Sequence, residues 1–161
     1  MRTSLCFVTA ILALAACGRA PRDPPPDGPI NAQLVLDRCV PPAERPRPVR
    51  ELPPARQVAM RDCVNAETAR QYNAQLPLRV SQHTVMDEVS VAGPALVFRY
   101  TVNTRRDELP QDVSRQIAGD VRAEACSDAG FRTMLAVGGM QIYRWVDRYG
   151  GPIGEVRVDH C

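Results

Sequence analysis

The sequence contains no lysine, so all twenty of its basic residues are arginine. Abundant alanine, proline and arginine accompany this absence, which indicates the codon usage of a G+C-rich genome rather than an arginine-specific binding face. Eighteen acidic residues leave a formal net charge of +2. This balance excludes the strong positive field of nucleic-acid-binding proteins, and no nucleic acid is expected as a partner.

The chain also lacks an apolar run of about twenty residues, the length that a membrane-spanning helix needs. Its longest apolar segment, residues 5–16, follows a short N-terminal stretch with one arginine and ends directly before Cys17. This pattern is typical of a secretory signal peptide, which we place at residues 1–16. The whole chain of 161 residues suffices for one ordinary domain, which excludes a TIM barrel or a doubly wound nucleotide-binding enzyme.

The end of the signal peptide reads Leu14-Ala15-Ala16-Cys17, and this motif resembles the lipobox of bacterial lipoproteins. The resemblance implies a diacylglycerol on the Cys17 thiol, cleavage before Cys17 and acylation, for example by palmitate, of the new amine. Several acyl chains would anchor the protein firmly to a membrane. Gly18 replaces the aspartate that commonly retains lipoproteins at the inner membrane, which favours the periplasmic face of the outer membrane. An ordinary signal peptide cut near Ala15 or Ala16 is the alternative.

Four further cysteines would remain in an exported chain, and an even number in an oxidising compartment indicates disulfides. Three pairings are possible. We expect Cys39–Cys63 and Cys126–Cys161, because these partners are nearest in sequence and each bridge would tie a weakly held segment to the body of the protein.

Proline divides the chain into two parts. Eleven of the fifteen prolines fall between Pro21 and Pro54, which predicts that residues 17–54 form the lipidated cysteine and a Pro-rich linker in extended polyproline II conformation. At about 3.1 Å per residue, residues 18–38 could reach roughly 65 Å. One short apolar run, residues 34–36, is expected to dock on the domain beside Cys39.

Residues 55–161 are expected to form one small α+β domain. The pattern predicts a helix over 55–74 and a hairpin of strands 84–92 and 95–103. A second helix is expected over 111–127, where Val113, Ile117, Val121 and Ala125 form an apolar stripe at four-residue spacing, and it continues over 131–137. A second hairpin of strands 140–148 and 153–160 follows. The expected architecture is a four-stranded antiparallel sheet with the helices packed on one face, preceded by the Pro-rich tether.

Few residues suggest catalysis or metal binding. Ser81 and His83 lie two apart in an expected loop, and the other histidine, His160, neighbours Cys161 at the end of a strand. Neither histidine has the spacing of a zinc site, and no Gly-x-Ser-x-Gly nucleophile motif occurs. We therefore expect no cofactor, no metal site and no enzymatic activity.

Three aromatic residues of the second hairpin, Tyr143, Trp145 and Tyr149, are the candidate partner-binding residues. Aromatic side chains carry much of the energy of protein interfaces. The expected contact surface is the helix-free face of the sheet or an edge strand that accepts a partner strand. In the competing interpretation, Tyr143 and Trp145 belong to the core.

The hairpin at residues 85–100, the helix of Cys126 and the ending with Tyr143, Trp145 and Cys161 resemble small exported bacterial α+β proteins. The layout of a lipid-anchored, disulfide-bonded domain is also similar to the pilotins of type II and type III secretion systems. This resemblance implies a non-enzymatic lipoprotein that binds an envelope protein, such as a secretin subunit or an assembly factor. A periplasmic inhibitor or immunity protein and a small hydrolase of envelope polymers are the alternatives.

Overall fold

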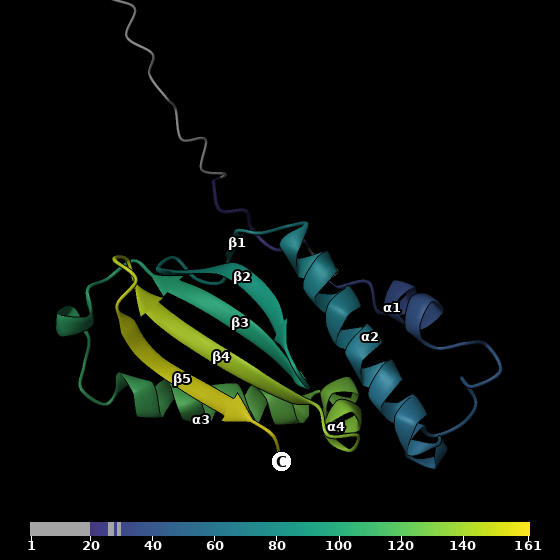
Figure 1. The fold of residues 1–161 in the computed structure, drawn as a ribbon. Helices are drawn as coiled ribbons and strands as arrows, with labels where there is room; N and C mark the ends of the chain where they lie inside the picture. Colours follow the sequence, from purple (N-terminus) through teal and green to yellow (C-terminus); the bar gives the residue numbers. More distant parts are fainter. Residues whose placement is uncertain (1–19, 26–27, 29) are drawn as a thin grey trace, which may run out of the picture.

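The computed structural model describes residues 20–25, 28 and 30–161; Cys17 and the predicted signal peptide lie outside the described residues. Within the described part, four α-helices and two 3-10 helices accompany one sheet (Figure 1). The helices are α1 (Ala32–Cys39), η1 (Val49–Glu51), α2 (Pro54–Asn73), η2 (Arg106–Glu108), α3 (Val113–Ser127) and α4 (Ala129–Leu135). The strands are β1 (Leu78–Arg79), β2 (Thr84–Ala92), β3 (Ala95–Val102), β4 (Met140–Asp147) and β5 (Pro152–Val158). No helix of this described part is long and apolar enough to cross a membrane.

The sheet confirms the predicted α+β class but differs from the prediction in strand number and direction. Both expected hairpins, β2–β3 and β4–β5, are antiparallel. The sheet has five strands in the order β1-β2-β3-β4-β5, because the two-residue strand β1 pairs with the start of β2. The expected antiparallel arrangement is wrong at the centre, where β3 and β4 are parallel.

The parallel pairing follows from the connection between β3 and β4. Residues 103–139 contain η2, α3 and α4, and such a long crossover returns the chain to the end of the sheet at which β3 starts. The next strand must then run in the same direction as β3. Its register places Phe98 beside Tyr143 and Tyr100 beside Trp145, so four aromatic side chains share one face of the two central strands.

The helices pack on one face of the sheet, as predicted, but this is the face that carries the aromatic side chains, which was not expected. One apolar cluster joins strand residues such as Val89, Phe98 and Trp145 to residues of three helices, among them Ala69 of α2, Ala125 of α3 and Phe131 of α4. Helix α2 begins with Pro54 in its first turn, where the missing proline N–H costs no helical hydrogen bond. Its position was correctly predicted from the sequence.

Helix α1 lies within the segment that the sequence predicted as linker. Val35 and Cys39 of this helix are buried with Leu52 and Met60 in a second apolar cluster against α2. The expected docking of the apolar run 34–36 therefore occurs, through an α-helix rather than an extended segment. The sequence did not predict this helix.

The linker also contacts the sheet upstream of α1. The amide of Arg22 donates to the carbonyl of Pro77 (2.9 Å), and the amide of Arg79 donates to the carbonyl of Arg22 (2.5 Å). These bonds form a parallel bridge between Arg22 and Leu78. The expected free reach of roughly 65 Å over residues 18–38 is wrong, because the chain is held at β1 and again in α1.

Two disulfides join the expected cysteines. Cys39 at the end of α1 is bonded to Cys63 of α2, with 5.6 Å between their Cα atoms. Cys126 of α3 is bonded to Cys161, with a Cα separation of 5.7 Å. Each bridge links a peripheral segment to a helix that packs on the sheet.

Candidate partner-binding groove

The three predicted aromatic anchors do not share one surface. Trp145 is buried and Tyr143 half-buried on the face of β4 that the helices cover. Both were expected to point outward, and the register with β3 instead stacks Tyr143 on Phe98 and Trp145 on Tyr100, with ring centroids 5.2 and 5.4 Å apart. The competing interpretation, in which these two residues belong to the core side, describes their position.

Tyr149 lies apart from them in the turn between β4 and β5, where 72% of it is exposed. The Asp147 carboxylate accepts hydrogen bonds from the amides of Tyr149 (2.9 Å) and Gly151 (2.7 Å) and fixes this turn. The guanidinium of Arg148 lies 5.1 Å from the Tyr149 ring centre. Tyr149 therefore cannot act on the same contact surface as Trp145.

The helix-free face of the sheet carries a row of charges rather than an apolar contact surface. Three ion pairs lie on it: Arg99 pairs with Asp87 (2.7 Å) and with Glu88 (3.1 Å), and Arg144 pairs with Glu155 (2.7 Å). The register places Arg99 directly beside Arg144, so Glu88, Arg99, Arg144 and Glu155 form one row across β2 to β5. This row of exposed charges makes the helix-free face a poor match to the expected hydrophobic docking surface.

Side chains from the helices form hydrogen bonds with backbone groups at both edges of the sheet. The Asn73 amide donates to the carbonyl of Val89 (2.6 Å), and its oxygen accepts from the Val89 amide (3.3 Å), as a neighbouring strand would. On β5, Ser114 donates to the carbonyl of Ile153 (3.0 Å) and Arg122 to that of Arg157 (3.3 Å). These contacts block the addition of a partner strand at these positions.

An apolar groove lies between the two long helices, over the centre of the sheet. Helix α2 packs mainly on β2 and α3 mainly on β5, so the central strands face the space between the helices (Figure 1). This space, the α2–α3 groove, has a volume of about 850 Å³. Phe98, Tyr100, Tyr143 and Trp145 line its floor, and Tyr72 of α2 lines one wall.

Helix α3 forms the opposite wall and is incompletely buried. Its predicted apolar stripe consists of Val113, Ile117, Val121 and Ala125, yet only Ala125 is buried and the other three are half-buried. All four line the groove. The stripe thus meets the core at its C-terminal end and presents apolar surface to the groove along the rest of its length.

A second hollow of about 500 Å³ adjoins the α2–α3 groove between α1, α2 and α4. The two share six lining residues, namely Ile30, Thr68, Leu96, Asp128, Phe131 and Gln141. Leu36 of α1 lines this extension, and Val80 beside β1 lines the α2–α3 groove; both are among the exposed large apolar residues. The continuous groove therefore extends from β1 to α4.

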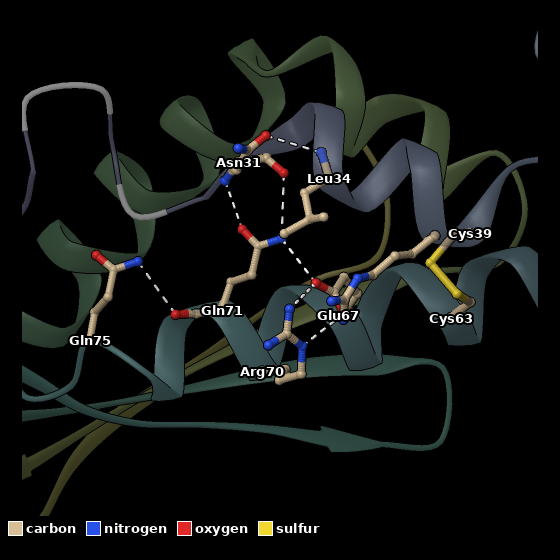
Figure 2. A network of polar contacts seen from close by, with 9 residues as sticks. Asn31, Leu34, Cys39, Cys63, Glu67, Arg70, Gln71 and Gln75 are labelled. Atoms are coloured by element: carbon tan, nitrogen blue, oxygen red, sulfur yellow. Dashed lines mark hydrogen bonds and ion pairs between the residues drawn. A yellow bond between two sulfur atoms is a disulfide. The ribbon is translucent and has the colours of Figure 1, made fainter.

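A polar network fixes the position of α1, which forms the outer wall of the extension (Figure 2). Glu67 of α2 forms ion pairs with Arg70 (2.5 Å) and with Arg38 of α1 (3.0 Å). The Gln71 side chain accepts from the Asn31 amide (2.7 Å) and donates to Glu67 (3.1 Å). Together with the Cys39–Cys63 bridge, these bonds hold α1 at both of its ends.

The hydroxyl groups of the groove are neutral. Burial raises the pKa of Tyr100 and Tyr143 above the ordinary value of 10, and the Tyr143 hydroxyl donates to the side-chain oxygen of Gln141. Burial also raises the pKa of Tyr72, and the negative charges of Glu124 and Asp128 add to this shift. The floor therefore offers hydrogen-bond donors and apolar surface, not a phenolate base or nucleophile.

The residues considered for catalysis do not form an assembled site. Ser81 and His83 are exposed, and their contact joins the backbone amide of His83 to the Ser81 hydroxyl (3.2 Å) rather than using the imidazole ring. His160 pairs with its neighbour Asp159 (2.6 Å) at the exposed C-terminal end. Among the residues that the structure describes, no group of three or more His, Cys, Asp or Glu side chains could hold a metal ion.

No protein-family model matches the chain, and no curated protein matches it in sequence. Solved structures resemble the fold. The Vibrio vulnificus type II secretion pilotin EpsS is 17% identical, with a TM-score of 0.54 over 63% of this chain and 89% of EpsS. The Vibrio cholerae pilotin AspS is 16% identical, with a TM-score of 0.52 over 65% of this chain and 93% of AspS.

A Pseudomonas aeruginosa protein assigned as secreted has the same TM-score as EpsS, 0.54, at 18% identity over 59% of this chain and 85% of its own. At these identities the likeness shows a common fold. The expected resemblance to small exported proteins and to pilotins is thus confirmed for the fold.

Sequence reasoning did not locate the groove, although it identified the α3 stripe that forms one wall. On α3, the acidic residues Asp120 and Glu124 directly precede the stripe residues Val121 and Ala125. These charges beside the apolar stripe were the one feature of the sequence that could have indicated the groove. The other wall could not be predicted, because the separation of α2 and α3 depends on the parallel pairing of β3 and β4.

Proposed function

We propose that the protein is a non-enzymatic, pilotin-like lipoprotein of the bacterial cell envelope that binds a protein partner in the α2–α3 groove. The observation that carries this proposal is the incompletely buried apolar wall of α3 beside the aromatic floor. A contiguous apolar surface of this kind typically marks an interaction site. Grooves between an apolar helix face and a core commonly receive an apolar segment of another protein.

The proposed location rests on the N-terminal segment. The lipobox-like motif at Cys17 supports acylation and a position at the periplasmic face of the outer membrane, and the two disulfides suit an oxidising compartment. The fold shared with the type II secretion pilotins EpsS and AspS supports a role in assembling an envelope complex.

Photocrosslinking from within the groove tests this function. The full-length protein, expressed with its signal peptide in its native host, carries a photoreactive amino acid at Ile117 in the groove. A matched variant carries it at Arg144, on the helix-free face. We expect crosslinks to one envelope protein from position 117 and none from position 144. Ile117→Asp, checked for folding by circular dichroism, should abolish co-purification of that protein, whereas Arg144→Asp should retain it.

Three other results would contradict the proposal. Equal crosslinking from both positions would place the contact outside the groove. A crosslink to a toxin or to an envelope enzyme would support the inhibitor alternative. Hydrolysis of an envelope polymer by the purified protein would reject the non-enzymatic assignment.

A further inference from the structure

The charged residues of the groove all have one sign. Asp120, Glu124 and Asp128 line the two parts of the groove, and none of the arginines in the described part of the chain does. The chain as a whole has more basic than acidic residues, so this local excess of negative charge opposes the overall balance. Asp120 and Glu124 form no ion pair with any described residue, and both are exposed.

The acidic residues stand on one side of the groove only. Asp120 and Glu124 are four apart on α3, which places their side chains one helical turn apart along the rim of the apolar stripe. Asp128 continues the row, but its carboxylate accepts from the Phe131 amide (2.5 Å) at the start of α4. The α2 wall contributes uncharged residues, Thr68 and Tyr72.

We infer that the α2–α3 groove selects a segment of a partner protein that combines an apolar face with lysine or arginine side chains spaced by one helical turn. In this arrangement, which rests on the proposed function, the apolar face covers the α3 stripe and Tyr143. The cationic groups pair with Asp120 and Glu124. Because the α2 wall is uncharged, the cationic edge of the bound segment must face α3.

The rim carboxylates contribute specificity and association rate more than affinity. Exposed ion pairs each contribute little, because water and salt screen them. A negative rim nevertheless attracts cationic segments and repels acidic ones, and it disfavours insertion of anionic lipid headgroups. Burial of the apolar face supplies most of the binding free energy.

Trp145 provides a reporter for this inference, because it is the single tryptophan of the chain and lies in the groove floor. The probe is a synthetic amphipathic helix of leucine and lysine, about 14 residues or four turns long. Its counterpart carries glutamate at every lysine position. We expect the lysine peptide to change Trp145 emission saturably, with an affinity that falls as salt rises, and the glutamate peptide to bind at least tenfold more weakly.

Substitutions locate the effect on α3. Asp120→Asn and Glu124→Gln should each weaken binding of the lysine peptide about two- to five-fold and reduce its salt dependence. Asp112→Asn, which removes the same charge at the start of α3 outside the groove lining, should leave both unchanged.

Equal binding of the two peptides would overturn the charge selectivity and leave groove binding intact. No binding of either peptide, or an equal effect of Asp112→Asn, would overturn the inferred partner chemistry. The crosslinking from Ile117 tests the proposed function independently of these outcomes.

Discussion

At the residue scale, Glu67 shows how a charged group can sit in the interface between α1 and α2. Its carboxylate accepts hydrogen bonds from Arg70, Gln71 and Arg38. The bond from Arg70 is the largest cause that lowers the pKa of Glu67 to about 2, and burial opposes this shift. A buried carboxylate with this many donors remains ionised, and its ionisation is coupled to the docking of α1.

This coupling predicts a pH-dependent contribution to stability. Because the folded pKa lies below the ordinary value of 4.5, ionised Glu67 stabilises the fold fully above that value. The contribution falls as pH drops from about 4.5 towards 2. Urea denaturation should show Glu67→Gln less stable than the wild type at pH 7, with the difference shrinking as the pH approaches 2.

The control is Asn31→Ala, which removes an uncharged cap of α1 that accepts from the Leu34 amide (3.0 Å). The Asn31→Ala variant should lose a similar amount of unfolding free energy at pH 7 and near pH 2. A Glu67→Gln difference that stays constant down to pH 2 would show that the ion pairs do not operate in the folded protein.

The candidate site was predictable only in part at this scale. Tyr143 and Trp145 were selected as candidate contact residues because aromatic side chains carry much of the energy of interfaces. Both line the proposed groove, and their role in partner binding stays a prediction. Their direction was wrong, because alternation along β4 identifies two faces without showing which one the helices cover. Tyr72, Phe98 and Tyr100 were missed, since residues distant in sequence reach the floor only through the sheet register.

At the element scale, α1 is a short helix that tertiary contacts hold in place. Eight residues are too few for a stable isolated helix. Its C-terminal end is tied to α2 by Cys39–Cys63, and Asn31 at its N-terminal end binds Gln71. The helix therefore depends on bonds to α2 rather than on its own propensity.

Removing the Cys39–Cys63 bridge should release α1 before the sheet unfolds. The double variant Cys39→Ser/Cys63→Ser should lose about 3 kcal/mol of unfolding free energy for a loop of 24 residues. Hydrogen exchange of the α1 amides should accelerate strongly while β3 and β4 remain protected.

Cys126→Ser/Cys161→Ser is the matched control, because it removes a bridge of similar loop length at the other end of the fold. It should leave α1 exchange unchanged. Unaltered α1 protection in the first variant, or peptide mapping that links Cys39 to Cys161, would contradict the assigned pairing.

The elements with strong local signals were predicted well. The alternation of β2, β3 and β4, the turn before β5, the proline limits of α2 and the four-residue spacing on α3 located these elements to within a few residues. The parallel contact of β3 and β4 was not predicted, because each hairpin is locally specified whereas their relative direction depends on the crossover. Strand β1 was missed because its two residues are too few to show alternation. Helix α1 was missed because its eight residues lie between proline-rich stretches and are too few to show a clear helical period.

At the scale of the whole molecule, the absence of lysine makes lipidation testable by amine chemistry. Full acylation of Cys17, as proposed, would consume the only amine of the mature chain. An amine-reactive label should then leave the native protein unmodified. The same label should modify the new N-terminus of a Cys17→Ser variant that is cut by an ordinary signal peptidase. Strong labelling of the native protein would refute full acylation.

The bridge between Arg22 and Leu78 sets the distance at which such an anchored protein would operate. Arg22 lies only five positions after Cys17, which corresponds to about 17 Å of fully extended chain. With acyl chains on Cys17, the β1 side of the groove near Val80 would remain within about two nanometres of the bilayer. Encounter with a membrane-bound partner would then occur by lateral diffusion in a thin layer, a two-dimensional search rather than one through the volume of the periplasm.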